Sequence, residues 1–417
     1  MDTIKQTLRN NIYSLSVLQI ANFIFPLLII PYLLRTIGIH NYGLIAFAQS
    51  LIAYYGLIID FGFNLSATTG IALEHDPSLR SHYFWKTIFS KVFLLIVCFI
   101  SLIVIVHFDP FRSNSTLFYL AFLSLIGNCL FPNWYFQGVQ KMSYIPAIQV
   151  PIRATVTLLI FIFVKDANDL NNAVLISGLG SALVGCIGFS IGVIHIGKRM
   201  YIPRIKEIMT HIKQSRTLFL GQAATSFFNE SLIFLLGLYA GYGAAGIFAS
   251  ADKIINAVTA FIAPISWAIY PQSGVLFTRS KKDALTFLSR IYRYGFLFFS
   301  ATTIGLFVFA PILTQFISGT DTRAITLLIR IMSPIPLTIF INNIYGTQIL
   351  INTGYQRLFT QTLIVGAIVS VILSLALIPL FHEIGAGVVS LTIEVFIAWS
   401  MKHYCTRHNL RLSREYA

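Results

Sequence analysis

The segment NNIYSLSVLQIANFIFPLLIIPYLL (residues 10–34) contains no Asp, Glu, Lys or Arg. An α-helix needs about 20 apolar residues to cross a hydrocarbon core of roughly 30 Å, so this segment is long enough to span a membrane. Lys5 and Arg9 precede it, as basic residues precede the apolar core of a signal peptide. The apolar run continues to Leu34 without a small-x-small cleavage site, so we interpret it as a retained first helix.

Similar runs fill the rest of the chain. Seven further stretches of at least 24 residues contain no charged residue: 36–59, 113–140, 170–197, 254–278, 294–320, 331–356 and 358–382. Four more carry a charge at the edge or one or two inside: 87–108, 142–164, 216–240 and 384–401. The runs are continuous, whereas transmembrane strands would alternate over segments of about ten residues. The sequence therefore predicts an all-α integral membrane protein with twelve transmembrane helices.

The composition supports this interpretation. Of the 417 residues, 56% are hydrophobic and 11% are charged, whereas about a quarter of an ordinary globular protein is charged. The net charge of +14 does not indicate nucleic-acid binding, because the bases lie in short islands between apolar runs. The four cysteines lie far apart and the nine histidines form no clustered set, so we predict no metal site and no redox pair.

The basic residues also predict the orientation of the chain. With the N-terminus inside, 22 of the 29 Lys and Arg residues fall in inner segments and four in outer ones. Such an excess marks the cytoplasmic side, so both termini are expected there. The longest connections are expected at about 65–86, 197–215 and 279–293, and no soluble domain is expected.

A weak internal repeat suggests two halves. A set of small residues recurs 203 positions later: Gly38, Gly43, Ala46 and Ala48 correspond to Gly241, Gly246, Ala249 and Ala251. The first and seventh helices would then run in the same direction, as in parallel repeats of six helices. We expect an N-terminal half at 1–197, a basic cytoplasmic linker at 198–215 and a C-terminal half with a short basic tail at 216–417.

Ionisable residues within or at the ends of the predicted helices are candidate site residues, because each is costly in hydrocarbon and needs a cavity or a partner. Four are basic and four acidic: Arg35, Arg153, Lys253, Arg330, Asp60, Glu230, Asp252 and Glu394. They could form a water-filled lumen or pair structurally. Amides accompany prolines in the helices that carry Gln19, Asn22, Asn256, Asn342 and Asn343. Proline bends suit helices that surround a cavity and a transporter that changes state.

Four blocks of the chain are similar to one family of transporters. They are PLLIIPYLLRTIGIHNYGLIAFAQS (Pro26–Ser50), DFGFNLSAT (Asp60–Thr68), FPNWYFQGVQKMSYI (Phe131–Ile145) and ADKIINAVTAFIAPISWAIYP (Ala251–Pro271). The chain resembles the Wzx-type flippases of polysaccharide units. These are the O-antigen transporters of the multidrug/oligosaccharidyl-lipid/polysaccharide exporter superfamily.

The resemblance implies a multi-pass protein of the bacterial inner membrane whose two six-helix halves open alternately to the two membrane faces. It implies an undecaprenyl-pyrophosphate-linked oligosaccharide as cargo, moved from the cytoplasmic to the periplasmic leaflet in lipopolysaccharide biosynthesis. The bilayer and the polymerase and chain-length proteins of the O-antigen pathway are expected partners. No cofactor is expected, although a coupling ion, H⁺ or Na⁺, is left open.

Such a cargo needs cations for its pyrophosphate and polar or aromatic groups for its sugars. The headgroup candidates are therefore Arg35, Arg153, Lys253 and Arg330. The sugar candidates are Gln19, Asn22, Asn64, Asn256, Asn342 and Asn343. The candidates for coupling or charge balance are Asp60, Glu230, Asp252 and Glu394. Among the last group, Glu230 is expected to bind a proton or cation in one of the two states.

Two other functions remain open from the sequence. A cation-coupled drug or solute antiporter of the same superfamily would share the architecture, although we would expect carboxylates to dominate its cavity. A membrane-embedded O-antigen polymerase or ligase would need a reaction centre on a long outer loop. The expected outer loops are about ten residues or shorter, so the sequence favours a transporter over an enzyme.

Overall fold

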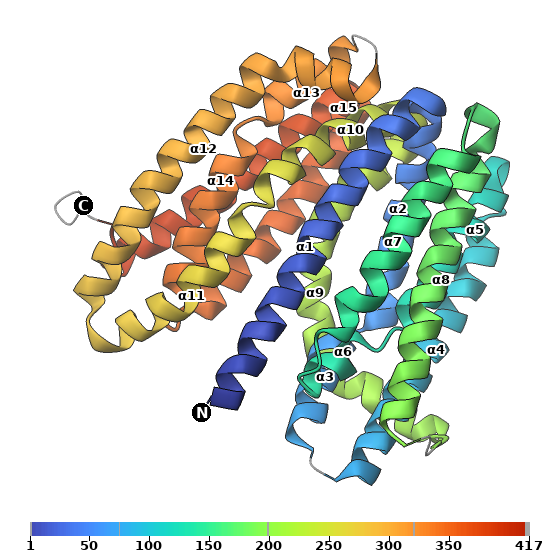
Figure 1. The fold of residues 1–417 in the computed structure, drawn as a ribbon. Coiled ribbons are helices and arrows are strands. Elements are labelled where there is room, and N and C mark those ends of the chain that lie inside the picture. The colour runs from blue at the N-terminus through green and yellow to red at the C-terminus, as the bar shows by residue number, and fades with distance from the viewer. Residues whose placement is uncertain (1, 75, 198–199, 320–321, 413–417) are drawn as a thin grey trace. The chain divides into compact units, whose positions relative to one another are not determined.

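The computed structural model describes residues 2–74, 76–197, 200–319 and 322–412, and for residues 2–13, 15 and 224–229 it describes the backbone alone. Within these ranges every regular element is a helix (Figure 1). A helix satisfies all its backbone hydrogen bonds internally, which an apolar segment in lipid requires. The predicted all-α fold class is confirmed.

The elements, in chain order, have the following bounds. The α-helices are α1 (Asp2–Thr36), α2 (Gly38–Asp60), α3 (Phe63–Leu73), α4 (Pro77–Ile105), α5 (Ser115–Leu130), α6 (Asn133–Gly138), α7 (Tyr144–Phe163), α8 (Leu170–His195), α9 (Ile205–Tyr239), α10 (Gly241–Thr259), α11 (Ile262–Arg279), α12 (Lys281–Ser318), α13 (Arg323–Met332), α14 (Ile335–Asn342) and α15 (Gln356–Arg407). Two 3₁₀ turns, η1 (Arg112–Asn114) and η2 (Ala167–Asp169), and a π-helix, η3 (Asn343–Ile351), complete them.

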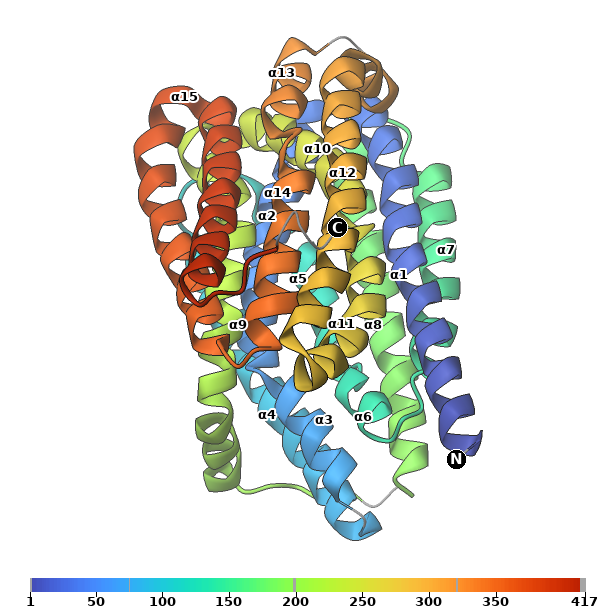
Figure 2. The same ribbon diagram turned by 90° about the vertical axis from the view of Figure 1, so that its left-hand side faces the viewer.

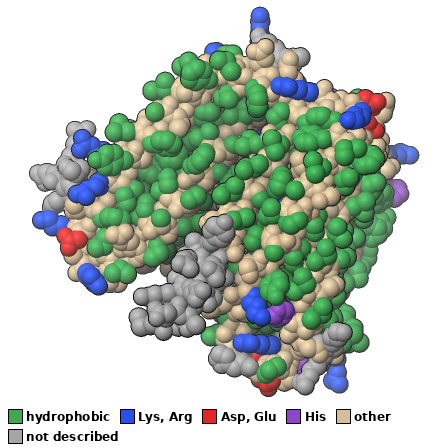
Figure 3. Space-filling model, viewed as in Figure 1, with side chains coloured by type: hydrophobic (Ala, Val, Ile, Leu, Met, Phe, Trp, Pro, Cys, Tyr) green, Lys and Arg blue, Asp and Glu red, His purple; other side chains and the backbone are tan. Residues whose placement is uncertain are grey.

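Ten segments of the described chain are helical, long and apolar enough to cross a membrane. Many of their large hydrophobic side chains are exposed, including Ile100 on α4 and Phe307 on α12. On the face shown in Figure 3, hydrophobic side chains cover the middle, and the charged side chains gather towards the margins. Such exposure is unfavourable in water and favourable against lipid. The chain is thus a multi-pass membrane protein.

Helix α15 is two helices joined by a sharp bend. Its backbone is non-helical at His382 (φ 49°, ψ −128°). The two arms lie side by side (Figure 2), and Gly385 approaches the carbonyl oxygen of Leu377 so closely that a Cβ there would lie 2.5 Å from it. The bend lies where the sequence separates the apolar runs 358–382 and 384–401.

The segments expected as long connections are mostly helical, which corrects the sequence interpretation. Helix α4 begins at Pro77, where the Asp76 carboxylate accepts a hydrogen bond from the Ser78 backbone N–H at 2.8 Å. Helix α12 begins at Lys281, where the Ser280 hydroxyl accepts one from the Asp283 N–H at 3.2 Å. These N-caps stabilise helix ends outside the apolar runs, so the helices are longer than hydropathy alone predicts.

The chain divides into two compact units, residues 1–41 with 45–226 and residues 42–44 with 227–417. The boundary falls inside α9, and the N-terminal part of this helix packs within the first unit. The Ser215 hydroxyl lies 3.1 Å from that of Ser66 on α3, and the Phe219 ring stacks on Phe61 at 4.3 Å between centroids. The C-terminal part of the expected linker is therefore held by the first unit.

The two sites of the proposed repeat share a local conformation. Gly38 and Gly241 each begin a helix and each have φ of +83°. This left-handed conformation costs glycine little and other residues more, so both sites use the same residue for the same turn.

Candidate functional site

The first unit contains a cavity of about 770 Å³. Its walls come from α1, α2, α4, α5, α7 and α8, with the beginnings of α3 and α6. Its described lining includes three charged residues, Asp60, Lys91 and Arg153, together with several amides. A polar cavity of this size among membrane helices is a candidate binding site.

Arg153 reaches the cavity from the middle of α7. Its guanidinium donates a hydrogen bond to the side-chain oxygen of Asn22 on α1. The two helices are also joined by Tyr32, whose hydroxyl donates to the Val164 carbonyl at 2.6 Å and whose ring contacts Phe161 at 4.7 Å. The sequence predicts Arg153 and Asn22 as separate site residues, and the structure brings them together.

Lys91 lines the cavity, and the sequence interpretation does not include it among the candidate site residues. We assigned it to an inner segment near the start of an apolar run, but α4 begins fourteen residues earlier and carries it into the unit. The residue is 2% exposed and lines the cavity. Its Nζ lies 3.6 Å from Asp60 Oδ1 and donates to the Asn128 carbonyl at 3.4 Å. The helix-start signal at Asp76 and Pro77 could have revealed its depth.

The Asp60 carboxylate is positioned by the turn between α2 and α3. Phe61 and Gly62 both have left-handed backbone, with φ of 43° and 78°. The turn sets the backbone N–H groups of Gly62 and Asn64 beside the carboxylate, which accepts hydrogen bonds from them. A Cβ at position 62 would lie 2.9 Å from that of Leu218, so glycine suits this turn sterically as well as conformationally.

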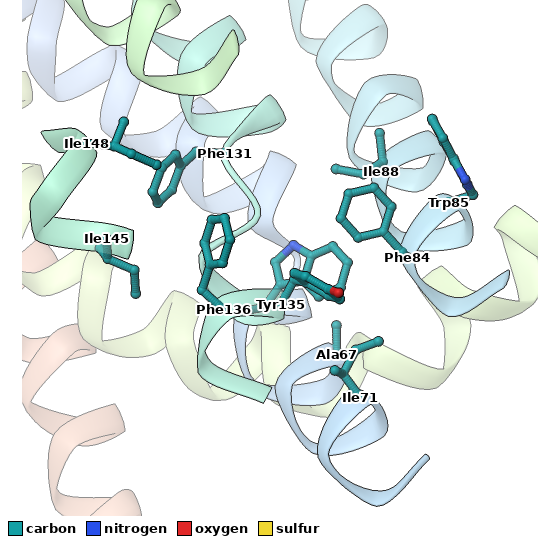
Figure 4. Close-up of a cluster of buried hydrophobic side chains, with 11 residues drawn as sticks. Ala67, Ile71, Phe84, Trp85, Ile88, Phe131, Tyr135, Phe136, Ile145 and Ile148 are labelled. Atoms are coloured by element: carbon teal, nitrogen blue, oxygen red, sulfur yellow. The ribbon is translucent and has the colours of Figure 1, made fainter. Parts of the chain in front are cut away.

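Aromatic side chains pack behind this end of the cavity. In Figure 4, Tyr135 of α6 lies near Phe84 of α4 and Ile71 of α3, and Phe131 of the α5–α6 connection lies next to Phe136 of α6. All five are buried. Trp134 is fully buried among them. The cluster explains the fold of the FPNWYFQG block: its aromatic residues form a core that fixes α6 and therefore Asn133, which lines the cavity.

The remaining predicted residues of the first unit lie outside this lining. Gln19 is on α1, and Arg35 is exposed in the last turn of that helix.

In the second unit the predicted residues form two groups. Glu230 on α9 lies within electrostatic range of Lys253 and Asp252 on α10, and Asp252 accepts a hydrogen bond from Asn256 at 2.7 Å. Glu394 on α15 is 9% exposed and accepts one from Asn342 at 2.6 Å.

Arg330 and Asn343 have other surroundings. Arg330 is exposed on α13, where its Nε donates to the Phe307 carbonyl at 3.3 Å and its guanidinium lies over the Phe307 ring. Asn343 donates to the Ser266 hydroxyl at 2.9 Å. The structure thus brings Asp60, Asn64 and Arg153 together at one cavity, with Asn22 hydrogen-bonded to Arg153, and places the second-unit candidates elsewhere within their own unit.

A buried histidine of the first unit, His211, lies outside the candidate membrane spans. His211 on α9 is 1% exposed, stacks on Phe63 and lies 3.3 Å from the Ser90 hydroxyl through Nδ1. Burial, with a smaller contribution from the Lys86 charge, lowers the pKa of His211 to about 4. The histidine is therefore neutral at physiological pH, and its role in the described contacts is structural.

The comparisons with known proteins agree with this architecture. The family model described as "Polysaccharide biosynthesis protein" matches residues 8–277. A protein of Escherichia coli (strain K12) named "Putative O-antigen transporter" is 31% identical over 98% of this chain and 99% of its own length. A protein of the same name from Shigella dysenteriae is 28% identical over 94% of this chain and 99% of its own length.

Two solved structures share the fold. The inward closed conformation of the lipid II flippase MurJ has a TM-score of 0.67 at 14% identity, covering 93% of this chain and 87% of its own. An inward-facing multidrug resistance MATE transporter of the MOP superfamily has a TM-score of 0.66 at 14% identity, covering 95% and 98%. From its sequence relatives, the chain belongs to the polysaccharide biosynthesis protein family, and the Wzx-type assignment made from its sequence is confirmed.

Proposed function

We propose that the protein is a flippase that moves undecaprenyl-pyrophosphate-linked O-antigen units from the cytoplasmic to the periplasmic leaflet of the bacterial inner membrane. The observation that carries the proposal is the cavity of the first unit, where Arg153 and the buried Lys91 face the same space as Asp60 and several amides. The names of the sequence relatives point to the same cargo class.

The cavity chemistry suits an amphiphile with a pyrophosphate. A pyrophosphate cannot cross hydrocarbon unaided, because burying its charges without partners is very costly. Arginine binds phosphate oxygens through two N–H groups at once, and lysine acts as a compact charge. We assign Arg153 as the principal headgroup residue. Arg35, Lys253 and Arg330 are further headgroup candidates that the cargo would meet at other stages of its passage.

Transport is proposed to proceed by alternating access. In this scheme the twelve helices form two six-helix halves related by a parallel repeat, and both termini are cytoplasmic. The shared backbone of Gly38 and Gly241 supports the repeat. Exchange of H⁺ or Na⁺ at Glu230, which lies among Asp252 and Lys253, would couple an ion gradient to the cycle. Glu394 is a second coupling candidate. Asn256, Asn342 and Asn343 would contact sugars in the second half, as would Gln19 and Asn22 in the first.

A drug or cation antiporter is less well supported by the cavity. Two of the three charged residues in its described lining are basic, so the lining has a net positive charge. A cationic drug would be repelled by such a lining, whereas an anionic headgroup would be attracted. Polymerase and chain-length proteins are proposed as partners because they would take up the flipped units.

Deletion of the gene tests the proposal. Lipid-linked sugar units should accumulate in the cytoplasmic leaflet, and O-antigen should disappear from the cell surface. The wild-type gene supplied on a plasmid should restore both. Surface O-antigen that persists in the deletion strain, without accumulated lipid-linked units, would contradict the proposal. A change in drug susceptibility without a change in O-antigen would instead indicate an antiporter.

A further inference from the structure

Three oxygens lining one end of the first-unit cavity accept no hydrogen bond from any described residue. They are Asp60 Oδ1, Asn64 Oδ1 and Asn133 Oδ1, and each atom is buried. All three residues belong to the cavity lining. Asp60 Oδ1 lies 3.6 Å from Lys91 Nζ, which is close enough for an ion pair but too far for a good hydrogen bond. Buried acceptors are normally paired, so these three need donors from another source.

The three residues are held together by the packing of α3 against α6. The Thr68 hydroxyl lies 2.5 Å from the Asn64 carbonyl within α3 and 3.2 Å from the Trp134 carbonyl in α6. Asn64 is one turn before Thr68, and Asn133 directly precedes Trp134. Asp60 is joined to Asn64 through the backbone N–H of that residue. The buried aromatic side chains behind α6 fix this arrangement.

The chemistry of the three oxygens selects a ligand that donates hydrogen bonds. An ionised phosphate carries acceptors only, so it cannot donate a hydrogen bond to these oxygens. A sugar hydroxyl donates one hydrogen bond and accepts others, so it can pair with a carboxylate or amide oxygen and also receive a bond from an amide N–H. Lys91 lies beside Asp60 but makes no hydrogen bond to Oδ1, so that oxygen is left for a donor from the cargo.

We infer that Asp60, Asn64 and Asn133 form a carbohydrate-binding subsite that accepts hydrogen bonds from sugar hydroxyls of the cargo. This inference rests on the proposed function, because it takes the cargo to be a lipid-linked sugar. The subsite recognises hydroxyl groups, whereas Arg153 elsewhere in the cavity lining recognises phosphate. A cargo sugar that lacks hydroxyls at the contacted positions binds less well, since the buried oxygens then stay unpaired.

Binding to purified protein in lipid nanodiscs tests the subsite. The first probe is the undecaprenyl-pyrophosphate-linked oligosaccharide extracted from the gene-deletion strain, and the second is undecaprenyl pyrophosphate without sugar. The measured quantity is the preference, the ratio of the two dissociation constants. Asn64→Ala and Asn133→Ala should each reduce the wild-type preference for the glycosylated lipid by about fivefold, the effect of one typical hydrogen bond. Their affinity for the sugar-free lipid should change less than twofold.

The matched control is Asn172→Ala, which removes an exposed amide on α8 that hydrogen-bonds Asp169. It should keep the wild-type preference. A second measurement does not depend on any variant: the free oligosaccharide, released from the lipid by mild acid, should compete with the glycosylated lipid on the wild-type protein but compete less on Asn133→Ala.

The possible results separate the inference from the proposed function. A wild-type protein that shows no preference for the glycosylated lipid contradicts the proposed function and the subsite together. A wild-type preference that both variants retain in full contradicts the subsite alone. Equal loss of affinity for both lipids also overturns it, because the amides would then act on the pyrophosphate or on folding.

Discussion

The cavity amides Asn64 and Asn133 of the first unit and the amide of Gln348 in the second unit differ in where their hydrogen bonds go. In the first unit, Asn64 and Asn133 line a cavity, and their side-chain oxygens accept no hydrogen bond from a described residue. In the second unit, Gln348 is fully buried and uses both ends of its amide. Its Nε2 donates to the Ser266 hydroxyl at 3.0 Å, and its Oε1 accepts from the Ser273 hydroxyl at 3.0 Å.

The backbone around Gln348 explains its pairing. Gln348 lies in the π-helix Asn343–Ile351, and Asn352 follows it with a hydrogen bond from Nδ2 to the Ser273 hydroxyl at 2.9 Å. The amides of this segment thus join it to α11, which carries Ser266 and Ser273. An amide paired within the protein stabilises a helix contact, whereas an amide with an unpaired oxygen at a cavity is available to a ligand.

The buried ion pair of the first unit offers the largest expected effect. Lys91→Met should lower the free energy of unfolding by about 3–5 kcal/mol, because Asp60 would be left as a buried, uncompensated charge. O-antigen display should be lost as well. Thermal unfolding of the detergent-solubilised protein and gel analysis of lipopolysaccharide measure the two effects. The double variant Lys91→Met with Asp60→Asn should regain much of the stability but not the display. A double variant that transports normally would show that this end of the cavity is structural.

Replacement of the cavity arginine tests whether function resides in the polar groups that line the first-unit cavity. Arg153→Ala should reduce flipping in reconstituted vesicles by about tenfold or more, since a charge-assisted bidentate contact is worth about 1.5–3 kcal/mol. Arg153→Lys should recover part of the rate because the charge remains. The comparison variant is Arg330→Ala in the second unit, where the arginine contacts Phe307. Arg330→Ala should have the smaller effect, and the opposite order would overturn the ranking of the two arginines as headgroup residues.

The amide network of the second unit should affect stability rather than cargo preference. Gln348→Leu should lower the free energy of unfolding by about 1–3 kcal/mol, because Ser266 and Ser273 each lose a partner. The preference for glycosylated over sugar-free lipid should remain that of the wild type. Thermal unfolding and the nanodisc binding measurement check both expectations. Altered preference without lost stability would make Gln348 a cargo contact and remove the contrast between Gln348 and the cavity amides of the first unit.

The smallest effect concerns the contact of α9 with the first unit. The pKa of His211 is lowered from 6.5 to about 4, mainly by burial. Because the pKa of His211 is lower in the folded than in the unfolded protein, the unfolded protein binds a proton more readily. The free energy of unfolding is therefore not reduced by His211 above about pH 6.5, and it falls as the pH drops toward 4, by up to about 1.4 kcal/mol per pH unit.

Thermal unfolding between pH 7.5 and 5.5 measures this loss, and His211→Gln, which does not titrate, should show a shallower decline. An identical decline in the variant would assign the pH dependence in this range to groups other than His211.

The sequence predicts part of the cavity lining. Arg153, Asp60 and Asn64 are candidates from the sequence, because ionisable and amide groups are rare in apolar segments, and all three line the cavity. Lys91 was missed because a base near the edge of an apolar run looks the same whether the helix starts there or nearly four turns earlier. Asn133 was missed because its neighbours are aromatic, and only their packing shows that the amide meets the cavity.

The sequence by itself determined that this protein is a helical membrane protein of the polysaccharide biosynthesis family. A long apolar segment in hydrocarbon has no water to pair its backbone groups, so it must pair them internally as a helix. This requirement applies within one segment and can therefore be recognised from the sequence of that segment. The tertiary structure alone decided which polar groups share a cavity and which pair with each other. Asn64 and Asn133 come from different helices, as do Gln348 and Ser266, and both pairs look alike in a sequence. Their different surroundings arise from helix packing, which depends on contacts between residues far apart along the chain.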